Sequence, residues 1–108
     1  MKKDDSIYIE HIIQALRQIT IYIEGLNEDD FLKNSLVQDA VIRQFEVIGE
    51  ATKRISKDYR EQHNHIPWQD MAGMRDKLIH DYIDVDLWVV YRTAKLDVPE
   101  LLSQITKI

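Results

Sequence analysis

Residues 9–23 read IEHIIQALRQITIYI. Apolar side chains recur here at steps of three and four residues, at Ile9, Ile12, Ile13, Leu16, Ile19 and Ile23. This spacing places them on one face of an α-helix, because a helix completes a turn about every 3.6 residues. Asp5 and Ser6 are both suitable N-caps, and Gly25 is a typical stop signal. We therefore predict a helix over about residues 6–24.

A polar connection at residues 27–30 leads to a second helical pattern. Ser35 and Gln38 match a capping box, in which each side chain bonds the backbone of the other residue. The pattern predicts a helix from Ser35 to about His63. Its main apolar stripe is Val37, Val41, Ile48, Ala51, Ile55 and Tyr59.

Further apolar residues on this second helix, Ile42, Phe45 and Val47, spread its apolar surface to another side. Such width indicates either a central position in a bundle or a surface that binds a partner. Gly49 lies among these residues and would permit a close approach of another helix. We favour a homodimer.

Three shorter helices are expected after residue 66. Pro67 suits the first turn of a helix that ends near His80, Asp84 is expected to cap the next helix, and Asp97 starts a last one. Residues 87–91, LWVVY, could form a strand if taken alone, but the cap and the continuation to Leu96 favour a helix. The last helix should turn Leu101, Leu102, Ile105 and Ile108 inward. The predicted fold is an all-α bundle of four to five helices in a single domain, residues 1–108.

The chain has 14 Lys and Arg against 19 Asp and Glu, a formal net charge of -5. This acidic balance argues against indiscriminate binding to nucleic acid, although local charge can differ. Residues 53–60, KRISKDYR, hold four basic side chains against one acid. A solvated helix face is the commoner meaning of such a run.

The absence of Cys excludes disulfides and thiolate nucleophiles and fits a reducing compartment. The N-terminal residues show no signal peptide, and no apolar run approaches the length of a membrane span. We expect a cytoplasmic protein without a metal or other cofactor.

Residues 75–82, RDKLIHDY, combine a permanent cation, a titratable imidazole and a phenol near a predicted helix end. Arg can grip a phosphate bidentately, and His titrates near neutral pH. On a helix, Asp76 and His80 would be i, i+4 neighbours, so Asp76 could orient the imidazole. Arg75 and His80 would be about 140° apart. Either the helix loosens before His80, or the site is a cleft approached from two sides, as between two subunits.

Metal-free cleavage of RNA requires a base for the 2′-hydroxyl, an acid for the leaving 5′-oxygen and a cation for the phosphorane charge. One chain offers one well-placed His, whereas two facing chains would offer two His and two Arg. The competing interpretation is a surface ion-pair set at Arg75, Asp76 and His80, with Tyr82 as a core or interface aromatic. His63 and His65 lie in a predicted turn with too few neighbours for a metal site.

Three segments in order resemble one family. Residues 44–51, QFEVIGEA, residues 66–74, IPWQDMAGM, and the pattern Arg75-x4-His80-x-Tyr82 are similar to the HEPN superfamily, specifically the HepT-like (DUF86) toxins of HepT/MntA-type toxin–antitoxin pairs. The likeness covers most of the chain.

The resemblance implies an all-α homodimer whose Arg-His motifs meet in an interfacial cleft and act as a metal-independent RNA endonuclease. It implies that Arg75 stabilises phosphate charge, His80 performs acid–base work and Asp76 orients His80. It also implies an MNT-type nucleotidyltransferase antitoxin that transfers AMP from ATP to Tyr82. The added charge and bulk would block RNA.

Two other functions are compatible with the same fold. The protein could be a non-catalytic helical binding or regulatory partner of a minimal nucleotidyltransferase, or a structural dimeric bundle without a ligand.

Overall fold

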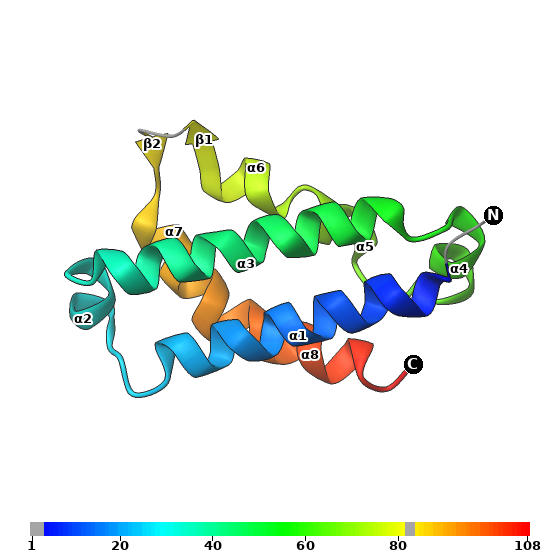
Figure 1. Ribbon diagram of the computed structural model, residues 1–108, viewed down its shortest axis with the longest axis horizontal. Helices are drawn as coiled ribbons and strands as arrows, with labels where there is room; N and C mark the ends of the chain where they lie inside the picture. Colours follow the sequence, from blue (N-terminus) through cyan, green and yellow to red (C-terminus); the bar gives the residue numbers. More distant parts are fainter. Residues whose placement is uncertain (1–3, 82–83) are drawn as a thin grey trace.

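A computed structural model of the chain describes residues 4–81 and 84–108 (Figure 1). Helices α1 (Asp5–Ile23) and α3 (Ser35–Arg54) are the longest elements and lie side by side. Four shorter helices pack against this pair: α5 (Trp68–Ala72), α6 (Met74–Leu78), α7 (Leu87–Arg92) and α8 (Val98–Ile105). The predicted all-α fold is confirmed, with a small addition of two short strands, β1 (Ile79–Asp81) and β2 (Asp84–Val85).

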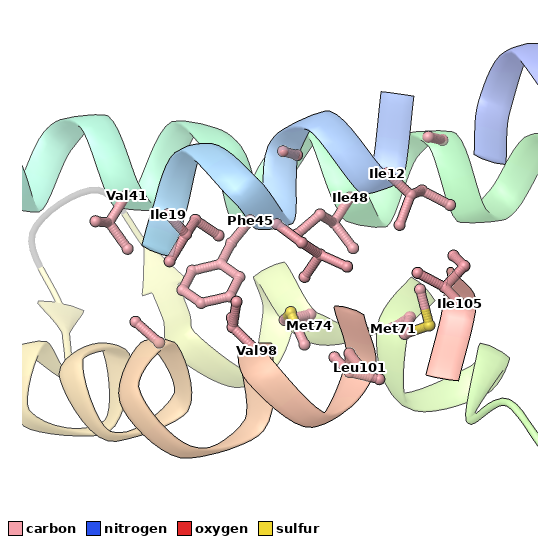
Figure 2. Close-up of a cluster of buried hydrophobic side chains, with 14 of the residues drawn as sticks. Ile12, Ile19, Val41, Phe45, Ile48, Met71, Met74, Val98, Leu101 and Ile105 are labelled. Carbon is pink, nitrogen blue, oxygen red and sulfur yellow. The ribbon is translucent and has the colours of Figure 1, made fainter. Parts of the chain in front are cut away.

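The core lies between the α1/α3 pair and the later helices, as Figure 2 shows. The stripe predicted on the first helix faces this core, because Ile12, Leu16 and Ile19 have no exposed surface. Met71 and Val98 close the opposite side. The inward position predicted for Ile108 is wrong, since 42% of that side chain is exposed beyond the end of α8.

The N-cap of the first helix precedes both predicted caps. Asp4 is the N-cap of α1, and its Oδ1 accepts a hydrogen bond from the Ser6 N–H at 2.9 Å. Asp5 instead accepts two bonds from Ser56, from its N–H at 2.8 Å and from its hydroxyl at 2.7 Å. The predicted stop at Gly25 is confirmed, because Gly25 has a φ of 76°.

The second long helix is shorter than predicted and begins differently. Asn34, not Ser35, is the N-cap of α3, and Gln38 donates to the Phe31 carbonyl at 2.9 Å instead of completing a capping box. The helix ends at Arg54, because Ser56 is held by Asp5 and caps the separate helix α4 (Lys57–Gln62).

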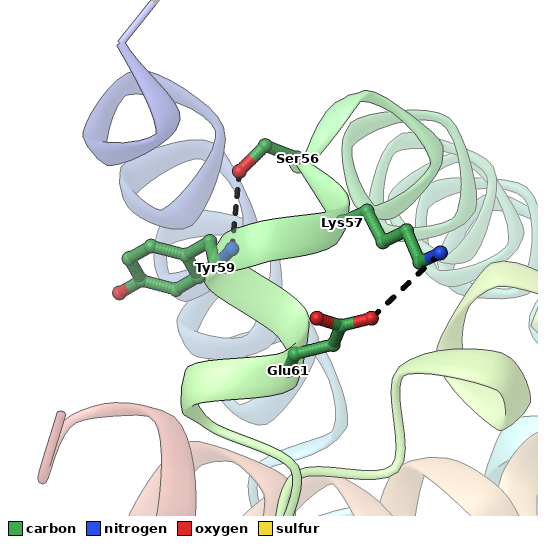
Figure 3. A network of polar contacts seen from close by, with 4 residues as sticks. All are labelled: Ser56, Lys57, Tyr59 and Glu61. Carbon is green, nitrogen blue, oxygen red and sulfur yellow. Dashed lines mark hydrogen bonds and ion pairs between the residues drawn. The ribbon is translucent and has the colours of Figure 1, made fainter.

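Figure 3 shows the start of α4, where the Tyr59 N–H donates to the Ser56 hydroxyl at 3.2 Å. Burial raises the pKa of the Tyr59 phenol, and the Asp5 carboxylate adds to the shift. The phenol therefore stays neutral to a higher pH than a free tyrosine does.

The predicted polar connection at residues 27–30 contains a short helix, α2 (Glu28–Leu32), with a capping box between Asn27 and Asp30. The fully buried ring of Phe31 packs 5.4 Å from that of Tyr91. This contact fastens the α1–α3 connection to α7.

The later part of the chain differs most from the sequence-based prediction. The expected helix from Pro67 to His80 is divided at Gly73 into α5 and α6, and it ends at Leu78. Asp86, not Asp84, caps the next helix, since its Oδ1 accepts from the Val89 N–H at 3.1 Å. Asp84 lies in β2.

The prediction that Asp97 starts the last helix is confirmed, because Asp97 is the N-cap of α8. No loop precedes it, since helical conformation continues from α7 through the π-helical segment η1 (Thr93–Asp97) into α8. Pro99 has no N–H to donate, and its ring opposes the carbonyl four residues before it in a regular α-helix. The wider turn, closed by a bond from the Val98 N–H to the Thr93 carbonyl, admits Pro99 without a break.

Gly49 brings α3 and α5 into backbone contact. A Cβ atom at this position would lie 3.3 Å from the Ala72 carbonyl oxygen and 3.8 Å from that of Met71. The predicted close approach at Gly49 is therefore confirmed, and it takes place inside one chain.

We predict that Gly49→Ala is less stable than Gly73→Ala, although both replacements add one methyl group, at Gly49 within α3 and at Gly73 in the turn between α5 and α6. Alanine favours helix by about 1 kcal/mol over glycine, but at Gly49 the methyl group would press on a backbone carbonyl. At Gly73 it would meet the Gln69 carbonyl at 3.5 Å, an ordinary contact. Chemical denaturation of both variants measures the difference. Equal stabilisation by the two substitutions would contradict this assignment.

Candidate active site

Arg75 lies on α6 and points away from the core. Its helix is anchored by Met74 and Leu78, which are 6% and 0% exposed, whereas half of the Arg75 side chain is exposed. Its guanidinium contacts the carboxylate of the adjacent Asp76 at 3.4 Å, and Asp76 is itself 74% exposed. Such a pair holds its members loosely, because exposed ion pairs gain little energy in water. Arg75 is thus available to an anionic ligand.

His80 lies on β1, two residues beyond the end of α6. The helical geometry from which the pairing of Asp76 with His80 was predicted is therefore wrong, since the i, i+4 relation holds only within a helix. That Asp76 orients His80 stays a prediction. Of the two alternatives drawn from helical geometry, the first is confirmed: the helix ends before His80. The side chain of His80 and all of Tyr82 lie outside the described residues.

The strand that carries His80 pairs with β2 in an antiparallel ladder, with Ile79 opposite Val85 and Asp81 opposite Asp84. Behind the ladder, the Asp86 N–H donates to the Leu78 carbonyl at 3.4 Å and joins the end of α6 to the start of α7. Figure 1 shows both strands projecting from the helical body. The Arg-x4-His segment thus runs from a packed helix onto a projecting ladder.

Trp88 and Arg92, near the start and at the end of α7, were not singled out by the sequence analysis. The Arg92 guanidinium carbon lies 4.6 Å from the centre of the Trp88 ring, and 45% of Trp88 is exposed. The i, i+4 spacing of an aromatic and a cation is the sequence signal that could have revealed the pair.

A groove of about 460 Å³ lies between α5, α6, η1 and α8. Its charged lining consists of Asp70, Asp97 and Glu100 against Lys77 alone. Three carboxylates against one ammonium repel a phosphodiester, so this groove is not the site for the chemistry predicted at residues 75–82.

The other residues considered in the sequence analysis take part in packing and surface contacts. The ring of His63 lies 4.5 Å from that of Tyr59, and the backbone carbonyl of His63 accepts a hydrogen bond from the Trp68 indole at 3.0 Å. Within the basic run, Lys57 pairs with Glu61 at 3.8 Å on an exposed face (Figure 3). In the described part of the chain, no three His, Cys, Asp or Glu side chains gather as metal ligands. Nor does any helix there combine the length and apolarity needed to cross a bilayer.

The fold is thus an all-α bundle of the HEPN type. A family model described as "Ribonuclease HepT-like" matches residues 12–108, and the chain belongs to this HepT-like family of the HEPN superfamily.

Several curated relatives support the same family. A protein of Thermococcus cleftensis named "Probable ribonuclease HepT" is 43% identical over all of this chain and 98% of its own length. A "Putative RNase" of Caldanaerobacter subterraneus is 40% identical over 94% of this chain and 90% of its own length. A "Gamma-glutamylcyclotransferase and putative RNase" of Methanocaldococcus jannaschii is 45% identical over the whole chain, which spans 49% of that relative. No solved structure matches the chain.

We predict that Asp86→Ala destabilises the protein by about 1 kcal/mol, the usual cost of losing an N-cap. In a domain of this size the melting temperature should fall by about 4–8 °C. Asp86→Asn keeps a capping oxygen and should remain near the wild type. Thermal denaturation followed by circular dichroism makes the comparison. Equal losses in the two variants would show that the carboxylate acts through its charge and not as a cap.

Proposed function

We propose that this protein is a metal-independent endoribonuclease, with Arg75 and His80 as its catalytic residues and Asp76 as a positioning residue. Membership of the ribonuclease HepT-like family carries the proposal. The exposed guanidinium of Arg75, on the helix that leads directly to the strand of His80, supports it.

The reaction follows from these residue types. A neutral imidazole accepts the proton of the 2′-hydroxyl, and the freed oxygen bonds to the adjacent phosphorus. The bond from phosphorus to the 5′-oxygen then breaks, and a protonated imidazole gives that oxygen a proton. The products are a 2′,3′-cyclic phosphate and a 5′-hydroxyl. The Arg75 guanidinium stabilises the charge that develops on the phosphorane oxygens.

The two proton transfers need two imidazoles in opposite states, and the motif holds one His in each chain. We therefore propose a homodimer in which each subunit supplies one His80 and one Arg75. The remaining apolar surface supports this assembly, because Ile21 and Leu36 are 59% and 80% exposed. Exposed apolar side chains are buried when proteins associate.

We propose further that the protein is the toxin of a type VII-like pair and that an MNT-type nucleotidyltransferase antitoxin transfers AMP to Tyr82. The phenol oxygen would attack the α-phosphorus of ATP and release pyrophosphate. The tyrosine lies two residues after His80, so the added phosphodiester would place a negative charge beside the imidazole. That charge would repel the RNA backbone.

The acidic surroundings of the motif favour one alternative. Asp76, Asp84 and Asp86 are all exposed near the ladder, and they disfavour a polyanion. In this alternative the protein is a non-catalytic helical binding or regulatory partner of the minimal nucleotidyltransferase. It predicts that the unmodified wild type does not cleave RNA.

We predict that the wild type cleaves single-stranded RNA in EDTA, and that His80→Ala and Arg75→Ala each slow cleavage by about 10²–10⁴-fold. These are the usual losses for a general acid–base and for a charge-stabilising donor. Denaturing gels of end-labelled RNA give the rates. His11→Ala and Arg43→Ala, which remove exposed residues of the same types from α1 and α3, serve as controls and should keep full activity.

A matched RNA with a single 2′-deoxy nucleotide at the cleavage position should resist the enzyme, because its nucleophile is missing. Cleavage of this RNA, loss of activity in EDTA, or full activity of His80→Ala would each refute the mechanism.

We predict that coexpression with the antitoxin adds one or more AMP units to the protein and abolishes its ribonuclease activity. Intact-mass spectrometry measures the addition, and the same preparation is then assayed for cleavage. Tyr82→Phe should gain no AMP and should stay active in the presence of the antitoxin. An AMP unit retained in Tyr82→Phe would place the modification elsewhere.

A further inference from the structure

Trp88 and Arg92 together form an aromatic and cationic surface on α7, which we call the α7 platform. The guanidinium lies 4.6 Å from the ring centre, and the ring is 45% exposed. A single exposed apolar side chain needs no functional explanation. An exposed indole with a cation over its ring is different, because the ring can stack on a nucleotide base while the cation binds a phosphate.

The α7 platform lies close to the Arg-x4-His segment. It begins two residues after Asp86, whose N–H bonds the Leu78 carbonyl at 3.4 Å. Two residues span at most about 7.6 Å of backbone. Leu78 in turn follows Arg75 by three residues and precedes His80 by two. A strand of RNA held at Arg75 and His80 therefore has the α7 platform within reach of a neighbouring nucleotide.

The charge of Arg92 is free for a ligand. Among the described residues, ion pairs join Lys57 to Glu61 and Arg75 to Asp76, and Arg92 takes part in neither. A guanidinium whose carbon lies over an indole ring still has N–H groups to donate to a phosphate. The indole offers a surface on which an unpaired base can stack.

We propose that the α7 platform binds one nucleotide of the RNA beside the cleaved phosphate, with the base on Trp88 and a phosphate on Arg92. This inference rests on the proposed ribonuclease function and names the residues that position its substrate. Stacking is effective in a chain with a net charge of -5, because it does not depend on an excess of basic residues. Single-stranded RNA is the substrate class that it selects, since paired bases have no free face.

Binding is measured in a His80→Ala background, where the RNA stays intact, by the anisotropy of a fluorescein-labelled single strand. Trp88→Ala should raise the dissociation constant about 5- to 140-fold, the range that corresponds to the loss of one stacked base. Trp88→Phe keeps a ring and should retain most of the affinity. Ile7→Ala, which truncates a 47% exposed apolar side chain on α1, is the matched control and should bind normally.

Arg92 is tested by the dependence of binding on salt. Arg92→Ala should reduce the slope of log affinity against log salt by about 0.7, the contribution of one phosphate contact on a single strand. Arg92→Lys keeps the charge but does not stack flat on the ring. It should keep the slope while affinity falls. An unchanged slope in Arg92→Ala would overturn the phosphate contact.

Intrinsic tryptophan fluorescence measures RNA binding directly on the folded wild-type protein. The chain has two Trp residues; Trp68 is 6% exposed in the core and Trp88 is 45% exposed. Adding RNA should quench the Trp88 emission, and Trp88→Phe should remove this response. Quenching that survives in Trp88→Phe would overturn the stacking assignment.

The competing occupant is a second copy of the chain, since Trp and Arg also dominate protein interfaces. Light scattering after size exclusion separates the two. If Trp88→Ala converts a dimer into a monomer, the α7 platform is an interface and the inference is wrong. If the wild type cleaves RNA while Trp88→Ala binds RNA equally well, the inference is wrong and the ribonuclease stands. A wild type that neither binds nor cleaves RNA overturns the proposed function itself.

Discussion

The backbone contact between α3 and α5 at Gly49 is the constraint on which the position of the candidate site depends. With a side chain at that position, the Ala72 carbonyl would lie 3.3 Å from its Cβ. The next residue, Gly73, divides α5 from α6, and Arg75 follows two residues later. Buried Met74 and Leu78 then lock the short helix against the core. The direction of Arg75 is therefore set by packing, although the side chain itself is exposed.

The end of α6 places the two halves of the Arg-x4-His motif on different kinds of backbone, Arg75 on a helix and His80 on a strand. A five-residue helix is too short to be stable alone, so its boundaries are set by tertiary contacts. The Leu78 carbonyl accepts from the Asp86 N–H at 3.4 Å, and Asp86 also caps α7. One residue thus closes the loop that contains His80 and starts the helix that carries Trp88. The projecting ladder and the α7 platform are parts of one arrangement.

The charge of the protein narrows the ways in which it can recognise RNA. Arg75 stands beside Asp76, and the charged lining of the groove of about 460 Å³ is mostly carboxylate. Broad electrostatic attraction is thus weak, which leaves local contacts: a bidentate guanidinium at the cleaved phosphate and an aromatic surface beside it. In the proposed dimer each of these contacts occurs twice. Because the contacts are local, the negative charge of AMP at Tyr82 would be enough to oppose them.

Apolar periodicity by itself determined the all-α class, the course of the first helix and the close approach at Gly49, because burial of a helical stripe depends on sequence spacing alone. Three segments in order, residues 44–51, residues 66–74 and the Arg75-x4-His80-x-Tyr82 pattern, likewise identified the family. Only the tertiary structure decided where the later helices end. Asp5 binds Ser56 from 51 residues away and separates α3 from α4, and Asp86 holds Leu78 and places His80 on a strand. Such long-range bonds leave no periodic trace in the sequence, and they end the helix that spacing had predicted to carry both Asp76 and His80.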